Sequence, residues 1–341
     1  MTLTPPQLQS LLERIARLHI LVVGDLFLDK YLVLDRHLSK TSLETGLEAY
    51  QVVEVRAVPG AAGTVAKAVA ALGARADILA VVGTDGEGHD LRGALRKLGA
   101  GHRHLLARPD RYTPTYLKPL MREPDGHEHE LNRMDIEPRS PLPSPVQAEL
   151  CARLEGLAGQ VDGVAVVDQV EAPDCGVITA QVRWCLAGLA RAHPRVVFLA
   201  DSRTRVGWFQ SMIVKPNLRE AAAAAGEETA GEVDPGRVRR WAAELLRRTG
   251  RPVFITAGEH GLFAFDGRKL HHQPAVPVSG PVDPVGAGDT AMAAIVGALC
   301  VGASPAQAAE LASLAAAVTV AKLGTTGEPT PEEILALRTG R

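Results

Sequence analysis

Aromatic residues, net charge and paired cysteines are all scarce in this 341-residue sequence, and each scarcity argues against a class of function. With 4% aromatic residues, the chain offers few surfaces on which a base could stack, which disfavours a nucleoside as substrate. A formal net charge of −2 gives no reason to expect nucleic acid or an anionic membrane as the main partner. The four cysteines form no C-x-x-C pair, as is typical of reduced thiols, so we expect a cytoplasmic protein.

Long hydrophobic runs are also missing. The longest, at residues 291–303 and 311–321, are each too short to cross a bilayer and are predicted to form buried helices. The first residues predict an amphipathic helix, with Thr4 as its cap and Pro5 in its first turn, rather than a secretion leader. We therefore expect neither export nor a membrane partner.

What the sequence does contain is an alternation of short apolar strands and helical patterns. Strands buried on both faces lose the alternation of polar and apolar residues, and these segments lack it. The rhythm predicts an α/β fold, a doubly wound and mostly parallel sheet with helices on both faces, whose ligands gather at the carboxyl ends of the strands. No linker or repeat divides the chain, so residues 1–341 are expected to form a single domain. The predicted strands are residues 19–24, 77–83, 163–167, 195–200, 212–214 and 253–256.

Two segments, at about 31–58 and 112–135, interrupt this rhythm with extended, alternating patterns. The pair Asp125-Gly126 predicts a hairpin within the second segment. We expect these strands to form a small β-sheet lid that projects from the main domain. Because an open sheet edge needs a partner or a cover, a homodimer through the lid strands is predicted.

The most informative motif is Gly286-Ala287-Gly288-Asp289, which is followed by an apolar helical run. Small residues let successive N–H groups turn toward one anion, and the positive end of the helix faces the same point. A carboxylate beside bound phosphate would be repelled by it, which is unexpected in a simple anion site. Its presence is explained if it serves as a catalytic base. A glycine-rich helix entry with Asp289 as a cap also fits. The dinucleotide fingerprint is disfavoured because prolines crowd the approach and no further sheet follows.

Together with Asp283, this motif resembles the signature D-x-x-G-A-G-D of the ribokinase/PfkB family of small-molecule kinases. The resemblance implies an ATP-dependent, Mg²⁺-requiring kinase. In that family the backbone corresponding to residues 286–288 binds the transferring phosphate, and the aspartate corresponding to Asp289 removes the proton of the accepting hydroxyl. A requirement for K⁺ stays open.

Other motifs of the same family follow in the expected order along the chain. On the acceptor side, the resemblance implies that sugar hydroxyls are bound by an early aspartate and a glycine-rich loop. On the nucleotide side, it implies an N-x-x-E motif that places Mg²⁺ through water, and a T-x-G-x-x-G turn. The matching residues are Asp25, Asp29, Gly60, Ala61 and Thr64 for the acceptor, Asn217 and Glu220 for the metal, and Thr256, Gly258 and Gly261 for the nucleotide.

Within the family, the chain is most similar to the kinase half of enzymes that phosphorylate heptose phosphate for ADP-heptose synthesis. The likeness rests on residues 42–44, on Asp29 and its neighbours, and on the last segment around residues 322–324. Two positions depart from the family loop, because Ala61 replaces the second glycine and Thr64 occupies the asparagine position. The acceptor is therefore expected to be a sugar or a sugar phosphate, with heptose 7-phosphate the first to test.

Several alternatives remain at this point. Asn217 and Glu220 also have the spacing of a helix capping box, and Asp25 also fits a residue that simply ends a strand. Arg203 and Lys215 fit either phosphate ligands or solvated loop charges. At the level of function, a non-catalytic sensor that binds sugar or nucleotide, or a nucleoside kinase, also fits the pattern.

Overall fold

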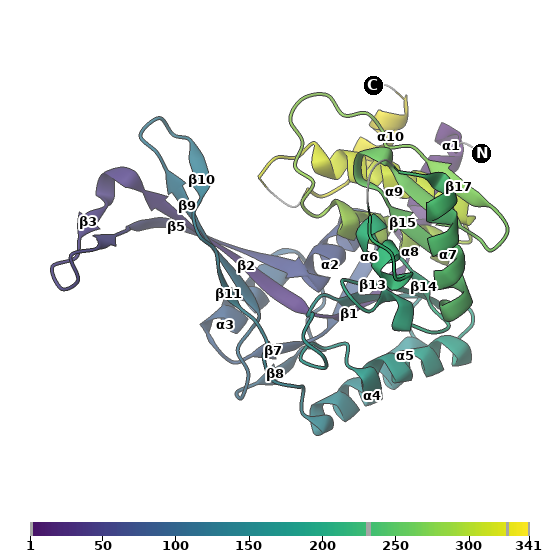
Figure 1. Cartoon of the computed structure of the whole chain (residues 1–341), viewed down its shortest axis with the longest axis horizontal. Coiled ribbons are helices and arrows are strands. Elements are labelled where there is room, and N and C mark those ends of the chain that lie inside the picture. Colours follow the sequence, from purple (N-terminus) through teal and green to yellow (C-terminus); the bar gives the residue numbers. More distant parts are fainter. Residues whose placement is uncertain (1–2, 230–232, 325–326, 340–341) are drawn as a thin grey trace.

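The computed structural model describes residues 3–229, 233–324 and 327–339, which form an α/β body with a projecting β-sheet arm (Figure 1). The first helix begins as the sequence predicts, because Thr4 and Gln7 form a capping box and Pro5 occupies the first turn. No helix among the described residues combines the length and apolar character that crossing a bilayer requires. The α-helices are α1 (Pro5–Ile15), α2 (Ala62–Ala71), α3 (Gly86–Lys97), α4 (Ser144–Ala158), α5 (Ala180–Ala192), α6 (Leu218–Ala224), α7 (Pro235–Thr249), α8 (Ala287–Cys300), α9 (Pro305–Val320) and α10 (Pro331–Thr339), with 3-10 turns η1 (Arg36–Leu38), η2 (Val206–Trp208) and η3 (Gly258–His260).

An eight-stranded sheet in the order β17-β16-β15-β14-β13-β12-β1-β6 forms the centre of the body. Its strands from β6 to β15 are parallel, whereas β16 and β17 run antiparallel at one edge. The predicted mostly parallel sheet is confirmed. The strands are β1 (His19–Gly24), β6 (Arg75–Leu79), β12 (Gly163–Asp168), β13 (Val197–Ser202), β14 (Ile213–Val214), β15 (Val253–Thr256), β16 (Leu262–Phe265) and β17 (Leu270–Gln273).

One strand prediction was wrong. The expected strand at residues 77–83 is two strands, because only β6 pairs with β1, and the chain then leaves the sheet. The second piece, β7 (Val81–Gly83), pairs instead with β8 (Leu106–Arg108). Both pieces are apolar and buried, so the composition alone does not reveal the change of partner.

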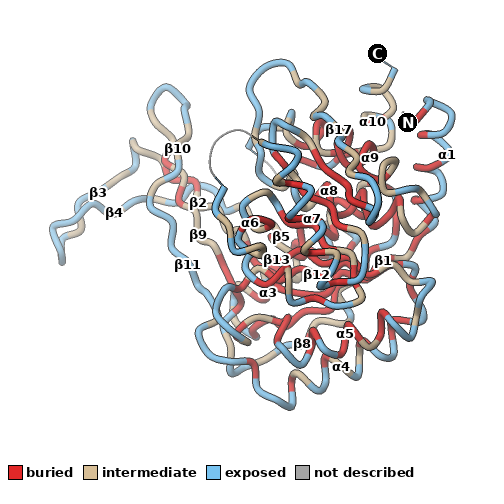
Figure 2. Tube along the Cα trace, turned by 45° about the vertical axis from the view of Figure 1, so that its right-hand side comes forward, coloured by how far each residue is buried: buried red, intermediate tan, exposed pale blue. Residues whose placement is uncertain are grey.

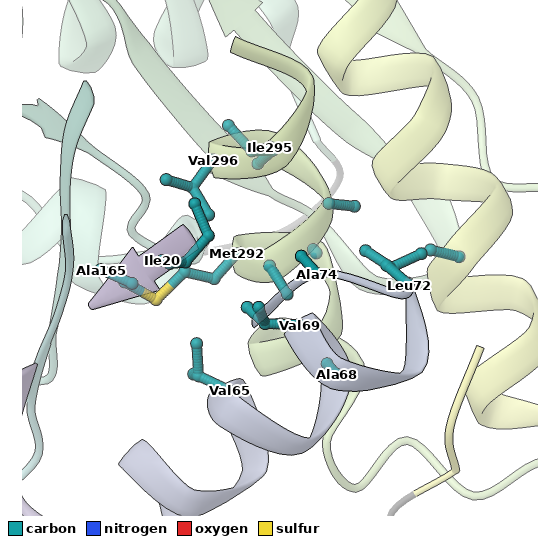
Figure 3. Close-up of a cluster of buried hydrophobic side chains, with 14 of the residues drawn as sticks. Ile20, Val65, Ala68, Val69, Leu72, Ala74, Ala165, Met292, Ile295 and Val296 are labelled. Atoms are coloured by element: carbon teal, nitrogen blue, oxygen red, sulfur yellow. The ribbon is translucent and has the colours of Figure 1, made fainter. Parts of the chain in front are cut away.

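Helices cover both faces of the central sheet, and each face has its own apolar core. On β1, Ile20 and Val22 point into the core under α2, α8 and α9, whereas Leu21 and Val23 point toward α4, α5 and α7. Figure 3 shows Ile20 packed against α2 and α8 side chains such as Val69 and Val296. Burial on both faces explains why these strands read as continuous apolar runs. Figure 2 shows the buried residues concentrated in this body.

The projecting arm is the predicted lid sheet, with strands in the order β10-β9-β2-β5 and with β11 also paired to β9. The expected hairpin lies between β9 and β10, where Gly126 has φ +85°. The first strand begins at Leu26 rather than near residue 31, so the lid sheet reaches the base of the body. The strands are β2 (Leu26–Asp35), β5 (Val52–Ala61), β9 (Thr115–Arg122), β10 (Glu128–Glu130) and β11 (Met134–Ile136), and a short ribbon of β3 (Lys40–Thr41) and β4 (Glu48–Ala49) lies at the outer end (Figure 1).

Candidate active site

Polar side chains from distant parts of the chain meet where the parallel strands end. The strands β1, β12, β13 and β15 end at Gly24, Asp168, Ser202 and Thr256, and the amino end of α8 is directed to the same edge. This is the edge at which parallel α/β sheets bind ligands. The predicted acceptor, metal and nucleotide residues are all in segments that border this edge.

The amino end of α8 has the form of an anion site. Gly286 adopts the left-handed conformation at φ +82°, and its carbonyl accepts from the Thr290 amide at 2.9 Å. The amides of Gly288 and Asp289 donate to no acceptor in the described part of the chain. Because the first amides of a helix lack intrahelical partners, these two N–H groups are available to an oxyanion.

Asp283 sets the path of the loop that enters α8. One carboxylate oxygen accepts from the Val285 amide at 3.0 Å, and the other accepts from the Gly324 amide at 3.2 Å. The Asp283 amide donates to the Val320 carbonyl at the end of α9 at 2.8 Å. The contacts of Asp283 therefore hold the loop that enters α8, and all of them are made within the protein.

Asp289 lies in the first turn of α8, where burial and the nearby carboxylate of Asp201 raise its pKa to about 7. The positive charges of Lys215 and Arg203 oppose that rise. Lys215 is buried, and its Nζ pairs with Asp201 Oδ2 at 2.8 Å. A Cβ placed on Gly288 would lie 3.8 Å from the same Nζ, so the ammonium group lies beside the α8 amides. Of the two interpretations of Lys215, a position near bound phosphate fits this placement, because the group is not a solvated charge.

Asn217 and Glu220 form the capping box that the sequence left as an alternative. Asn217 Oδ1 accepts from the Glu220 amide at 2.9 Å, and Glu220 Oε2 accepts from the Asn217 amide at 2.8 Å. Burial and the Asp201 carboxylate raise the pKa of Glu220 to about 7. Its other oxygen, Oε1, accepts no hydrogen bond from any residue that the structure describes.

Whether Asn217 and Glu220 fit a Mg²⁺ site depends on what else would coordinate the ion. Within the described ranges, no group of three His, Cys, Asp or Glu side chains is placed to hold a metal. Magnesium binds oxygen ligands, keeps several waters and shares its coordination with substrate phosphates. Glu220, which has a free oxygen and a carboxylate destabilised by its surroundings, fits such a shared site but not a cage built by the protein alone.

The predicted nucleotide turn follows β15 and lies next to the capping box. The Thr256 amide donates to the Pro216 carbonyl at 3.0 Å, and Gly258 and Gly261 both have positive φ, at +56° and +88°. A Cβ on Gly261 would lie 2.2 Å from the Gln273 carbonyl oxygen, so only glycine fits there. The motif residues are therefore required for the turn itself.

The acceptor side lies at the base of the lid. Asp29 is on β2 and pairs through Oδ1 with Lys118 Nζ on β9 at 2.9 Å, a partner that sequence motifs did not reveal. A Cβ on Gly60 would lie 2.7 Å from Asp29 Oδ2, so the glycine allows this carboxylate to lie against the loop. The charge of Asp29 also contributes to the raised pKa of Asp289, so the two carboxylates lie near enough to interact electrostatically.

The two positions that depart from the family loop have distinct local structures. Ala61 has φ +52° and ψ −113°, a conformation that residues other than glycine avoid. Thr64 is buried in the first turn of α2, and its hydroxyl donates to the Pro59 carbonyl at 3.5 Å. The strain at Ala61 agrees with the glycine that the family has at that position.

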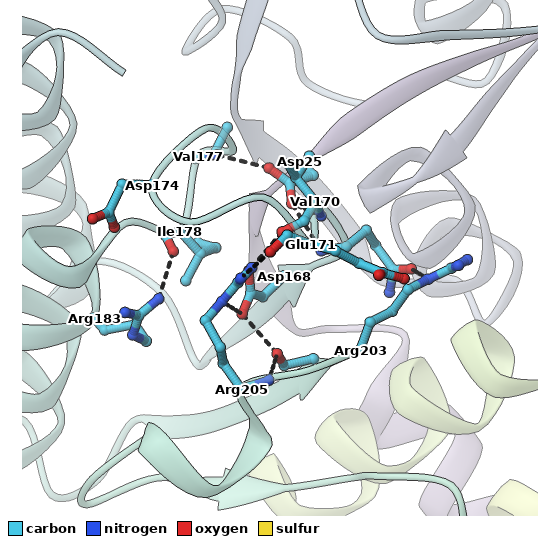
Figure 4. Close-up of polar contacts among 12 residues, drawn as sticks. Asp25, Asp168, Val170, Glu171, Asp174, Val177, Ile178, Arg183, Arg203 and Arg205 are labelled. Atoms are coloured by element: carbon cyan, nitrogen blue, oxygen red, sulfur yellow. Dashed lines mark hydrogen bonds and ion pairs between the residues drawn. The ribbon is translucent and has the colours of Figure 1, made fainter. Parts of the chain in front are cut away.

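Asp25 has the strand-end position that the sequence analysis left open. It is buried, and its carboxylate accepts from the amides of Gln169 and Val170 at 2.8 Å each and of Val177 at 2.7 Å (Figure 4). Burial and the Asp168 carboxylate raise the pKa of Asp25 to about 6, although the three amides act in the opposite direction. The acceptor-side role predicted for Asp25 would therefore have to operate through the loop that it holds.

Comparison with known proteins agrees with this geometry. The family model described as "pfkB family carbohydrate kinase" matches residues 18–333. The Bifunctional protein HldE of Caulobacter vibrioides is 34% identical over 312 residues, which cover 90% of this chain and 60% of that protein. The protein of the same name from Trichlorobacter lovleyi is 30% identical over 332 residues, which cover 96% and 64%. The chain thus spans less than two thirds of the length of these relatives.

Solved structures share the fold at lower identity. Arabidopsis thaliana ribokinase, complexed with ribose and ATP, has a TM-score of 0.69 at 20% identity and covers 94% of this chain and 99% of its own. Escherichia coli phosphofructokinase-2, in complex with potassium, has a TM-score of 0.70 at 17% identity, with 95% and 98% covered. The ribokinase-like fold and the family predicted from the D-x-x-G-A-G-D motif are both confirmed, and the chain belongs to the pfkB family of carbohydrate kinases.

Proposed function

We propose that the chain transfers the γ-phosphate of ATP to a hydroxyl of a sugar or sugar phosphate, with Asp289 as the general base. The observation that carries the proposal is a partly buried carboxylate with a pKa of about 7 in the same helical turn as two free amides. A base with such a pKa is poised to accept a proton near neutral pH. The adjacent amides are poised to stabilise the oxygens of the transferring phosphoryl group.

Each side of the site then has a defined task. Asp29 would orient the acceptor hydroxyls, and its pairing with Lys118 fixes the position of its carboxylate. The amides at residues 286–289 and the buried Lys215 would receive the terminal phosphate. Asn217 and Glu220 would hold Mg²⁺ through water, and the ion would neutralise phosphate charge when bound. Thr256, Gly258 and Gly261 would form the wall on the nucleotide side.

The relatives guide the choice of acceptor. We infer a phosphorylated sugar, with heptose 7-phosphate first, from the match to the HldE proteins and from basic groups around the acceptor side. The stacked pair Phe27 and Tyr116, with ring centroids 4.8 Å apart, lies at the acceptor side and is a feature that favours a nucleoside. Arg133 covers the Tyr116 ring at 4.3 Å, which leaves less of that surface for a base.

The test is ADP formation with ATP, Mg²⁺ and a panel of sugars, sugar phosphates and nucleosides, with and without potassium. The wild-type chain should be stimulated by a sugar or sugar phosphate, and Asp289→Asn should lower kcat by about 10²–10⁴-fold while keeping its fold. Tight binding of ligands without any phosphorylated product would favour the sensor. Wild-type activity in Asp289→Asn would show that another group is the base.

A further inference from the structure

The loop of residues 169–179, between β12 and α5, is held from two sides. Asp25 accepts three of its amides, from Gln169, Val170 and Val177, at 2.7–2.8 Å. The Asp25 amide donates to the Val167 carbonyl, and the Asp25 carbonyl accepts from the Ala62 amide at the start of α2. One buried residue therefore joins the end of β1, the predicted sugar loop and the loop after β12.

Arg205 holds the same loop by donating to carbonyl groups of the loop. Its guanidinium pairs with the buried Asp168, with Nη2 2.6 Å from Oδ1 and Nε 3.1 Å from Oδ2. It also donates to the Glu171 carbonyl at 2.8 Å and to the Val170 carbonyl (Figure 4). Because amides and carbonyls of the loop are both bonded to buried charges, the loop is firmly placed.

The side chain that this loop places is Arg203. Its Nε donates to Gln169 Oε1 at 2.8 Å, and its amide donates to the Asp168 carbonyl at 3.2 Å. The Nη1 and Nη2 groups of Arg203 bond to no acceptor in residues 3–229, 233–324 or 327–339. The residue is exposed, and its charge acts on Asp289 and on Tyr116 of the lid strand β9. An unpaired guanidinium edge is thus held near enough to Asp289 and Tyr116 for its charge to act on both.

We propose that Arg203 is a specificity-determining residue that receives an anionic group of the acceptor, and that Asp25 is the positioning residue that fixes it through Gln169. This inference rests on the proposed function and names its substrate class as phosphorylated sugars. A guanidinium with two free nitrogens matches the geometry of a phosphate group better than that of neutral hydroxyls. Arg203 bonds to Gln169, and the Gln169 amide is held by Asp25, whose carbonyl bonds to the predicted sugar loop at Ala62; these contacts place Arg203 on the acceptor side.

The first experiment compares two acceptors that differ by one phosphate, fructose and fructose 6-phosphate or sedoheptulose and its 7-phosphate. Relative to wild type, Arg203→Gln should lower kcat/KM at least about tenfold more for the phosphorylated member, through KM, because one charge-assisted contact is lost. The KM for ATP should stay within the range of a matched control, Arg240→Gln, an exposed arginine on α7. An equal loss with both acceptors, or a rise confined to the KM for ATP, would overturn the proposal.

The second experiment tests the connection between Asp25 and Arg203. Asp25→Asn keeps the shape of the side chain but replaces one acceptor oxygen with a donor, so it should raise the KM for the phosphorylated acceptor more than it lowers kcat. In the Arg203→Gln background the same change should add little, because both act on one contact. Fully additive losses would refute the positioning role. If Asp25→Asn does not fold, Gln169→Leu removes only the bond to Arg203 and carries the same expectation.

These outcomes are distinct from failure of the kinase assignment. A wild-type chain that phosphorylates no acceptor contradicts the proposed function itself. A wild-type chain that phosphorylates both members of a pair equally well contradicts only the role of Arg203.

Discussion

At the scale of one residue, the Asp289 carboxylate is kept in its position at a cost in stability. Its pKa is raised from 3.8 to about 7, so the folded protein binds its proton more tightly than the unfolded chain does. The stability contributed by that proton is present at low pH and is lost as the pH rises through about 7. A residue held in its less favourable charge state is typical of active sites.

We therefore expect Asp289→Asn to raise the free energy of unfolding at alkaline pH by about 1–3 kcal/mol. The melting temperature should rise with it. The gain should shrink as the pH falls from about 7 toward 3.8. In the active wild type, kcat/KM should rise with pH through the same region, because the base must be ionised. Thermal unfolding over this pH range measures the gain in stability, and a pH–rate profile measures kcat/KM. A gain in stability that is independent of pH would contradict the electrostatic origin.

Ala61 gives a second prediction at this scale. Its positive φ strains a residue that has a Cβ, so Ala61→Gly should stabilise the protein by about 1 kcal/mol in urea unfolding. Ala62→Gly, one residue later in α2, is the matched control and should destabilise by roughly 0.5–1 kcal/mol, because a helical alanine has no such strain. If the two variants shifted stability equally, strain at Ala61 would not be the cause.

Single residues also differ in how well the sequence predicts them. The sequence singled out the motif residues of α8 because small residues and a carboxylate stand next to one another before a helical run. Lys118 was not found, and Lys215 was left between a phosphate ligand and a solvated charge, because each depends on a carboxylate that is distant along the chain, Asp29 or Asp201. No local signal marks such pairs.

At the scale of elements, the entry to α8 depends on Asp283, which joins that loop to the segment after α9. Asp283→Ala should lower kcat/KM for ATP at least about tenfold, since misplacing the α8 amides by even an ångström is costly. Asp266→Ala is the control, because Asp266 accepts from the Arg268 and Lys269 amides in a turn before β17. Steady-state kinetics should show no comparable loss in the control. Equal activity in both variants would exclude a role for the Asp283 clamp.

The sequence predicted strands correctly where one apolar segment pairs in one sheet. It failed where one apolar segment divides between two sheets. The strands β1 at His19–Gly24 and β15 at Val253–Thr256 lie where the sequence placed them. The apolar run at 77–83 was wrongly taken as one strand, because pairing with β1 or with β8 demands the same composition.

For the whole molecule, the lid sheet exposes apolar side chains that the body does not cover. Val53, Val55 and Met134 on its strands are 43%, 53% and 52% exposed, respectively, which is unusual for a sheet without a partner. We propose that two copies of the chain pair through these strands. Sedimentation at micromolar concentration should show a dimer, and Val53→Glu with Val55→Glu should shift it to a monomer.

The control for the dimer is Leu337→Glu, on α10, which is 40% exposed and remote from the lid. It should leave the assembly unchanged. A wild-type monomer at that concentration would contradict pairing through the lid, whatever the variants do.

The sequence by itself determined the α/β fold class and the family, because these depend on local composition and on motifs of residues adjacent in the chain. Only the tertiary structure decided that Asp25 serves three amides of a distant loop, that Asp29 pairs with Lys118, and that Asp289 is held near neutral pKa. The physical reason is that hydrogen bonds, ion pairs and desolvation depend on distances through space, which the sequence does not specify.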